Sequence, residues 1–85
     1  MASYNVEIKR SAAKELEHLP PKDRTRIIAR IRAFATDPRP AGCEKLSGQE
    51  RYRVRQGNYR ILYEIDAAVV WVIVVRMAHR REMDR

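Results

Sequence analysis

The feature that most constrains the fold of this chain is the segment RYRVRQGNYRILYEI, residues 51–65. On both sides of Gly57 and Asn58, charged or polar residues alternate with apolar ones, the pattern of a strand with one buried face. A Gly-Asn pair between two such runs predicts a two-residue turn of type II′, which needs positive φ at its first residue. The segment is therefore predicted to form a β-hairpin with strands at residues 51–56 and 59–66.

This turn also determines which residues of the hairpin face each other. Arg51 is expected opposite Glu64, where the two side chains form an exposed ion pair, and Arg55 is expected opposite Arg60. Two arginines directly across a ladder repel each other, so an anionic partner is expected between them. The solvent-facing side is predicted to carry Arg51, Arg53, Arg55, Arg60, Leu62 and Glu64.

The rest of the chain predicts an α+β fold in one domain, residues 1–85. Residues 4–8 alternate as a short strand, and apolar residues recur at helical spacing over 11–19, with Ser11 as N-cap, and over 21–35. Residues 38–50 have no sustained period and are predicted to be a loop. The order β-α-α-β-β-β predicts a twisted, mainly antiparallel four-stranded sheet with the helical hairpin packed on one face.

The longest apolar run, residues 67–75, is far shorter than the ~20 residues of a membrane-spanning helix. It predicts a central strand over residues 69–77, covered at least in part on each face and with Trp71 in the core. Cys43 is the single cysteine, so no intramolecular disulfide is possible, and the N-terminus does not resemble a signal peptide. A cytoplasmic location without membrane contact is expected.

Charge points to a polyanionic partner. The net charge is +7, and 14 of the 18 basic residues are arginine, whose planar fork of donors suits phosphate better than lysine does. Arg53, Arg55 and Arg60 are expected to grip a phosphate together. The alternative is a solvated basic face, and these residues alone do not distinguish catalysis from binding.

Other residues are secondary candidates. Continuing the last strand brings His79 and Arg80 toward the same groove, although His79 alternatively only ends a strand and titrates in solvent. Phosphate contacts that do not read sequence are expected from Arg24, Arg30, Lys45, Arg51 and Arg81, the alternative for the helical ones being a solvated helix face. His18, Cys43 and His79 lack metal-ligand spacing, so neither a metal nor another cofactor is expected.

Several segments together give a resemblance that covers nearly the whole chain. The segments LP, DPRP, KLSG, YRVRQGNYRILYEI and HRREMDR resemble the RelE/ParE toxin superfamily of bacterial toxin–antitoxin systems. Members of the RelE branch are ribosome-dependent endoribonucleases that cut messenger RNA in the decoding site and are silenced by an antitoxin. The resemblance therefore implies a toxin with this β-α-α-β-β-β fold and this activity.

The resemblance also implies a catalytic set. Its members, matched position by position, are Arg53, Arg55, Arg60, His79, Arg80 and Asp84. Metal-free cleavage uses the neighbouring 2′-hydroxyl as nucleophile, with Arg60 and Arg80 stabilising the phosphorane and His79 or Asp84 as base. The family commonly has tyrosine at the last motif position, whereas Asp84 offers no stacking surface and repels phosphate. This departure implies either reduced activity or a mechanism that depends on His79.

The expected partners are a cognate antitoxin with an acidic or amphipathic segment, the ribosome and messenger RNA, with operator DNA bound only through the antitoxin. Two alternatives stay open. A ParE-like chain shares the fold but inhibits DNA gyrase without nuclease chemistry, and the replacement by Asp84 favours it. A non-catalytic RNA-binding module would use the same arginines as a phosphate clamp.

Overall fold

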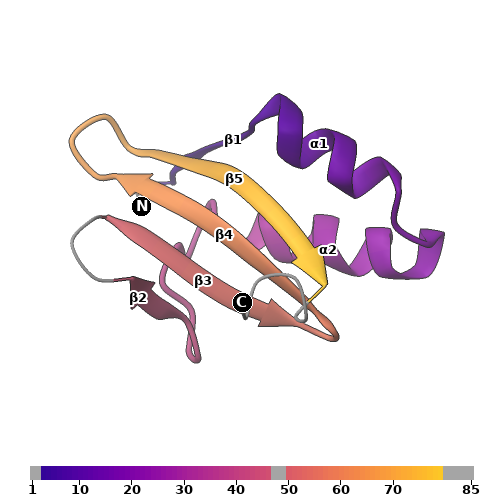
Figure 1. The fold of residues 1–85 in the computed structure, drawn as a ribbon. Helices are drawn as coiled ribbons and strands as arrows, with labels where there is room; N and C mark the ends of the chain where they lie inside the picture. Colours follow the sequence, from indigo (N-terminus) through magenta and orange to yellow (C-terminus); the bar gives the residue numbers. More distant parts are fainter. Residues whose placement is uncertain (1–2, 47–49, 80–85) are drawn as a thin grey trace.

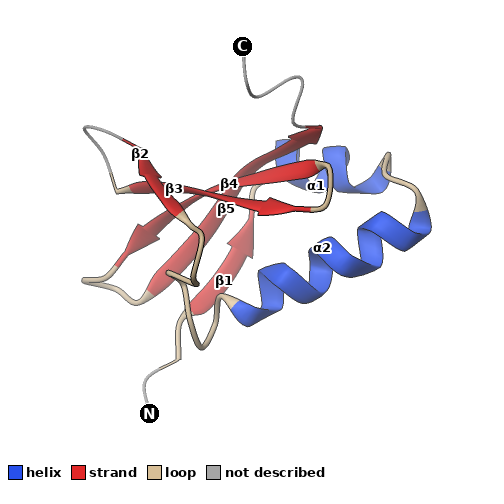
Figure 2. Cartoon of the chain, turned by 90° about the horizontal axis from the view of Figure 1, so that it is seen from below, coloured by secondary structure: helices blue, strands red, loops and turns tan. Residues whose placement is uncertain are grey.

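The computed structural model describes residues 3–46 and 50–79, which form two helices and one five-stranded sheet. The elements are β1 (Asn5–Ile8), α1 (Arg10–Glu17), α2 (Pro21–Ala33), β2 (Glu44–Leu46), β3 (Arg51–Gln56), β4 (Tyr59–Asp66) and β5 (Trp71–His79). The strand order is β1-β5-β4-β3-β2, with β1 parallel to β5 and the other pairs antiparallel (Figure 1). Both helices lie on the same side of the sheet (Figure 2), which confirms the predicted α+β architecture.

The sheet has one strand more than predicted. β2 pairs with the first half of β3, with Glu44 opposite Arg53 and Leu46 opposite Arg51. It lies within residues 38–50, which the sequence predicted to be a loop. A three-residue strand is too short to show an alternating pattern, and its pairing with β3 rather than its own sequence makes it a strand.

The β3–β4 hairpin has the predicted register. All six facing pairs are as expected, from Gln56 opposite Tyr59 to Arg51 opposite Glu64. Gly57 has φ of 61°, and Val70 is the one non-glycine residue of the described chain with positive φ, so Asn58 has negative φ. Positive φ at the first turn residue alone is the signature of type II′, which confirms the predicted turn.

Aromatic rings at the centre of the core join the sheet to α2. Tyr63 on β4 is fully buried and stacks on Phe34, at the end of α2, with ring centroids 4.2 Å apart. The ring of Tyr52, on the neighbouring strand β3, has its centroid 5.8 Å from that of Tyr63. The Tyr63 hydroxyl donates a 2.8 Å hydrogen bond to the carbonyl of Pro38, and burial raises the pKa of this phenol, so it stays a donor. The loop after α2 is thereby tied to the centre of the sheet.

The starts of the two helices are fixed by different features. α2 begins at Pro21, where a proline needs no hydrogen-bonded N–H. α1 begins at Arg10, with Lys9 at the N-cap and no side-chain cap, so the prediction of Ser11 as N-cap was wrong. Its start is fixed instead by the preceding strand, because Lys9 N–H donates to the carbonyl of Val74 on β5. Neither helix of the described chain is long and apolar enough to cross a membrane.

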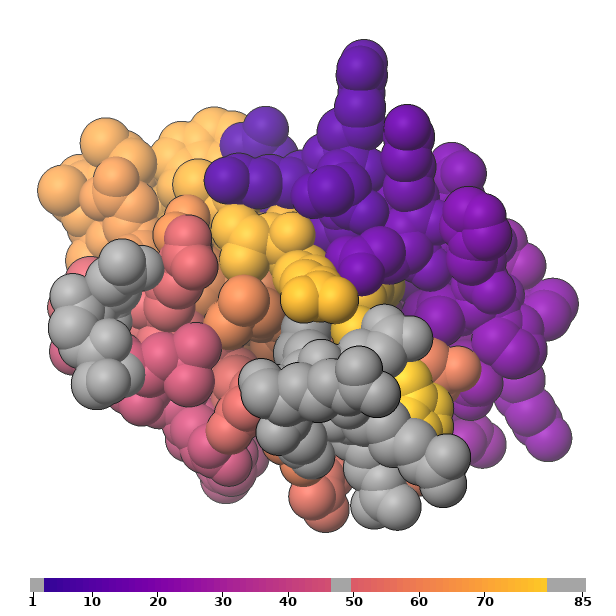
Figure 3. Space-filling model, in the orientation of Figure 1, coloured from indigo at the N-terminus to yellow at the C-terminus, as the bar shows by residue number. Residues whose placement is uncertain are grey.

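α1 covers the part of β5 that β1 does not reach. β1 pairs with β5 only as far as Val74, and beyond it a carboxylate oxygen of Glu15 accepts a 3.1 Å hydrogen bond from the backbone N–H of Met77. The same carboxylate forms an ion pair with Arg76 at 3.5 Å. The space-filling view shows α1 in dark violet directly against the yellow β5 (Figure 3).

One core prediction was wrong. Trp71 is 36% exposed, and the neighbouring Val69 is 57% exposed. Trp71 is the first residue of β5 and lies on the face opposite the helices, whereas Val72 and Val74 point to the helices and are fully buried. An apolar run looks alike in sequence whether one or both of its faces are covered, and here β5 is fully covered on the helix side.

The Tyr63 hydroxyl generates a stability prediction. Tyr63→Phe leaves the Pro38 carbonyl without its donor, so we expect the free energy of unfolding to fall by about 1–3 kcal/mol. Urea denaturation followed by circular dichroism measures this change. The control is Tyr52→Phe, whose hydroxyl bonds the exposed Glu50 and Arg39 side chains, which water resolvates, so its loss is expected to be smaller. Equal midpoints for wild type and Tyr63→Phe would contradict the role of this bond.

Candidate functional site

The hairpin arginines line a groove at the edge of the sheet. β2 pairs with β3 only as far as Arg53, so residues 54–56 form an outer edge. Beside this edge is a groove of about 310 Å³ lined by Arg30, Ala41, Gly42, Glu44, Arg53, Val54, Arg55 and Arg60. We call it the arginine groove. Its four guanidinium groups come from β3, β4 and α2.

The structure brings Arg53, Arg55 and Arg60 together, as their positions in the hairpin predicted. It also adds Arg30, which the sequence offered only as one of several cationic residues of the second helix. Nothing in the local pattern of α2 distinguishes Arg30 from Arg26 or Arg32, because only the packing of α2 on β3 selects it. Three chain segments thus supply positive charge to one site.

Some donors in this groove are buried without an acceptor. The Nε atoms of Arg30 and Arg53 are inaccessible to solvent and have no hydrogen-bond partner among residues 3–46 and 50–79. A buried guanidinium N–H without an acceptor is unfavourable. The same arginines line the groove, where an anion with several oxygens, such as a phosphodiester, would neutralise their charge.

One acid lies among these arginines. Arg53 Nη2 donates to Glu44 Oε2 at 2.7 Å, which makes a cross-strand ion pair between β3 and β2. The hydrogen bond and charge of Arg53 hold the pKa of Glu44 below its ordinary value, and the charges of Arg60 and Arg55 lower it further. Sequence reasoning missed Glu44, because its place in the groove depends on the pairing of β2 with β3.

His79 lies in a different place from the arginines. It is opposite Tyr59 in the β4–β5 ladder, with the two rings edge to face at a centroid distance of 5.7 Å. Strand parity puts both on the helix side, where they line a separate cavity of about 420 Å³ with Lys14, Glu15 and His18 among its other residues. The expectation that His79 reaches the arginine groove is therefore wrong for this structure, because a register shift between β4 and β5 at Leu62/Tyr63 interrupts the alternation of β5. Beyond this shift Met77 and His79 lie on the helix side, as Val72 and Val74 do before it.

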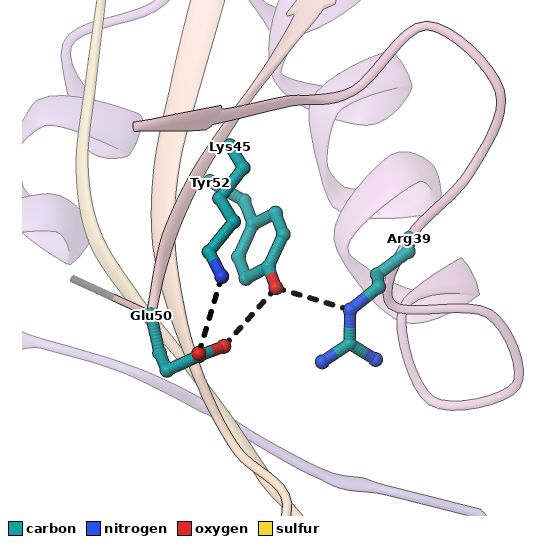
Figure 4. A network of polar contacts seen from close by, with 4 residues as sticks. All are labelled: Arg39, Lys45, Glu50 and Tyr52. Atoms are coloured by element: carbon teal, nitrogen blue, oxygen red, sulfur yellow. Dashed lines mark hydrogen bonds and ion pairs between the residues drawn. The ribbon is translucent and has the colours of Figure 1, made fainter. Parts of the chain in front are cut away.

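The other predicted RNA contacts separate into groups. Arg51 forms the predicted ion pair with Glu64 at 2.8 Å. Lys45 forms an ion pair with Glu50 at 3.3 Å, in a network that also joins Tyr52 and Arg39 (Figure 4). Arg24 is on α2 outside the arginine groove. Among the predicted RNA contacts that the structure describes, Arg30 lines the arginine groove. Arg81, and the predicted catalytic residues Arg80 and Asp84, lie outside the described residues.

Comparison with known proteins places the chain among toxins. Residues 6–84 match the family model described as the ParE toxin of the type II toxin–antitoxin system parDE. The putative toxin RelE1 of Methanocaldococcus jannaschii is 34% identical over 86 residues, covering 93% of this chain and 91% of that protein. Toxin RelG of Mycobacterium tuberculosis is 32% identical over 90 residues, covering 96% and 97%.

The chain belongs to the RelE/ParE superfamily of type II toxin–antitoxin toxins. The fold of this RelE/ParE toxin agrees with a solved relative. The toxin–antitoxin complex RelBE2 of Mycobacterium tuberculosis matches with a TM-score of 0.82 and 26% identity, over 93% of this chain and 100% of the other. The arginine groove is thus a feature of a RelE/ParE toxin, built on the hairpin through which the sequence first resembled that superfamily.

The Glu44–Arg53 ion pair generates a titration prediction. A depressed pKa means that the pair is fully formed above the ordinary range for glutamate, near ~4.3, and is lost as pH falls through the lower pKa of the folded state. We expect carboxyl NMR to show Glu44 titrating below this range in the wild type. In Arg53→Gln its pKa should rise, because the largest cause of the shift is removed. The same pKa in both proteins would show that Arg53 does not hold this carboxylate.

Proposed function

We propose that this RelE/ParE toxin is a ribosome-dependent endoribonuclease that cleaves messenger RNA in the decoding site and so inhibits translation. One observation carries the proposal. Arginines from β3, β4 and α2 line a single groove, where their guanidinium groups would bind an RNA phosphate.

The proposed chemistry needs few groups. The 2′-hydroxyl loses its proton and attacks the adjacent phosphorus, and the phosphorane gains negative charge. The bond to the 5′-oxygen then breaks, which leaves a 2′,3′-cyclic phosphate and a 5′-hydroxyl whose proton comes from water. Arg53 and Arg55 position the RNA backbone, and Arg60 with Arg80 stabilises the charge that develops on the phosphorane oxygens. Arg53, Arg55 and Arg60 are already held together by the β3–β4 hairpin before RNA arrives.

The step also needs a base that takes the proton of the 2′-hydroxyl. The sequence offered two residues for this role. His79 lies against Tyr59 in the cavity beneath α1 and not in the arginine groove. Asp84 is therefore the proposed base, and as a carboxylate with an ordinary pKa near ~3.9 it is a weak one, which fits a slower enzyme than a relative with tyrosine at that position.

Membership of this toxin family also supports a protein partner. In Mycobacterium tuberculosis the related RelBE2 toxin was solved as a toxin–antitoxin complex. We propose that this chain likewise binds a cognate antitoxin, whose acidic or amphipathic segment covers the basic surface and blocks RNA.

A second candidate function is inhibition of DNA gyrase. The observation that favours it is the match of residues 6–84 to the ParE toxin family. A gyrase inhibitor needs no set of arginines converging on a phosphate. The two functions separate in one pair of assays, primer extension on messenger RNA in purified translating ribosomes and supercoiling by gyrase.

The arginine groove generates a kinetic prediction. Arg60→Ala is expected to lower the single-turnover rate of cleavage on programmed ribosomes by about 100-fold or more, by analogy with the loss of one oxyanion donor. The control is Arg32→Ala, which removes the same charge from an exposed position of α2 outside the groove. We expect this control to cleave at close to the wild-type rate. Similar rates for Arg60→Ala and wild type, measured by primer extension, would refute the catalytic role of Arg60.

A further inference from the structure

The Glu44–Arg53 ion pair occupies one N–H donor, Nη2, of a guanidinium group that the proposed function assigns to RNA. A carboxylate offers two oxygens to a guanidinium fork, as a phosphodiester does. The Glu44 carboxylate accepts from Arg53 Nη2 at 2.7 Å, and the charges of Arg55 and Arg60 also act on it. Within the described chain, it is therefore the anion of the groove.

The two partners of this pair differ in how firmly they are held. The Arg53 side chain is only 25% exposed, whereas that of Glu44 is 63% exposed. Glu44 is the first residue of a three-residue strand at the outer edge of the sheet. Arg53 lies inside the sheet between β2 and β4. The carboxylate is thus able to swing into solvent while the guanidinium stays in place.

We propose that Glu44 is an intramolecular competitor of RNA phosphate, which occupies the phosphate position at Arg53 in the free protein and is displaced when RNA enters the arginine groove. The proposal rests on the proposed function only in taking RNA as the ligand of the groove. Displacement exchanges one ion pair for another, so RNA gains less from Arg53 than from an uncompensated arginine. Weak or non-specific RNA contacts therefore do not displace Glu44 from Arg53.

A competitor inside the site has a measurable effect on salt dependence. Each phosphate that a protein neutralises on a single strand changes the slope of log K against log salt by about −0.7, because condensed counterions are released. In the wild type, Arg53 is already neutralised by Glu44. In Glu44→Gln it is free to neutralise a phosphate, so the slope should steepen by about 0.7 and binding should tighten about 3- to 10-fold at low salt.

The chain contains a matched control. Arg51 and Glu64 form a second ion pair across strands at 2.8 Å, on the same hairpin but outside the groove. Glu64→Gln changes the net charge by the same amount and also frees one arginine. It is therefore expected to alter RNA affinity little, since general attraction alone is weakly sensitive to one unit of charge on this basic chain.

The experiment is fluorescence anisotropy of a labelled single-stranded RNA with 2′-O-methyl groups, which cannot be cleaved, over roughly 50 to 300 mM KCl. Tighter binding and a steeper slope in Glu44→Gln, but not in Glu64→Gln, support the proposal. Equal effects of the two variants would show that RNA binding responds only to net charge, and this would overturn the proposal. Weaker binding in Glu44→Gln also overturns it, because Glu44 would then position Arg53 for RNA rather than compete.

Failure of this inference is distinguishable from failure of the proposed function. If the wild-type protein cleaves messenger RNA on programmed ribosomes but Glu44→Gln does not change the salt slope, the role of Glu44 as a competitor is refuted and the proposed nuclease function stands. If Glu44→Gln steepens the slope but the wild-type protein cleaves no RNA, the role of Glu44 stands and the protein binds RNA without being a nuclease. Absence of RNA binding by all three proteins overturns the inference.

Discussion

The register of the β3–β4 hairpin is the constraint on which the rest of this structure depends. Because side chains alternate between the faces of a strand, a slip by one residue would turn the hairpin arginines into the core and Tyr63 out of it. The turn at Gly57 prevents this slip, since its positive φ permits a type II′ turn at that place. One turn therefore selects both the aromatic core and the charged edge.

The core and the groove are two consequences of one arrangement. Stacking of Tyr63 on Phe34 and its hydrogen bond to Pro38 hold the end of α2 and the following loop against the sheet. That loop leads to residues 41 and 42 of the arginine groove and then to β2. Charges that repel each other are thus held together by apolar packing behind them. An arrangement that costs free energy in the absence of an anion is typical of a binding site.

The sequence predicted what depends on local pattern and missed what depends on long-range packing. The hairpin, its turn and the Arg51–Glu64 pair follow from alternation and one dipeptide, and all are found. Strand β2 and the place of Glu44 depend on a pairing with no local signal. Likewise, the exposure of Trp71 depends on which face of β5 the helices cover. The side on which His79 lies depends on a register shift between β4 and β5 that has no local sequence signal.

The family assignment and the groove carry different kinds of information. The comparisons establish a toxin of the RelE/ParE superfamily, in which related chains share a fold. Whether such a chain cuts RNA depends on the chemistry of its surface, since one fold supports several functions. In this chain the residues that favour RNA as the ligand are Arg30, Arg53, Arg55 and Arg60, whose guanidinium groups line one groove.

The most direct test of this account is a cryo-electron microscopy structure of the chain on a ribosome programmed with messenger RNA that carries 2′-O-methyl groups in the decoding site. The account predicts a phosphate of that RNA in the arginine groove, within about 3 Å of guanidinium nitrogens of Arg53 or Arg55 and of Arg60. Messenger RNA that runs over another surface of the protein, with the groove away from its backbone, would contradict it.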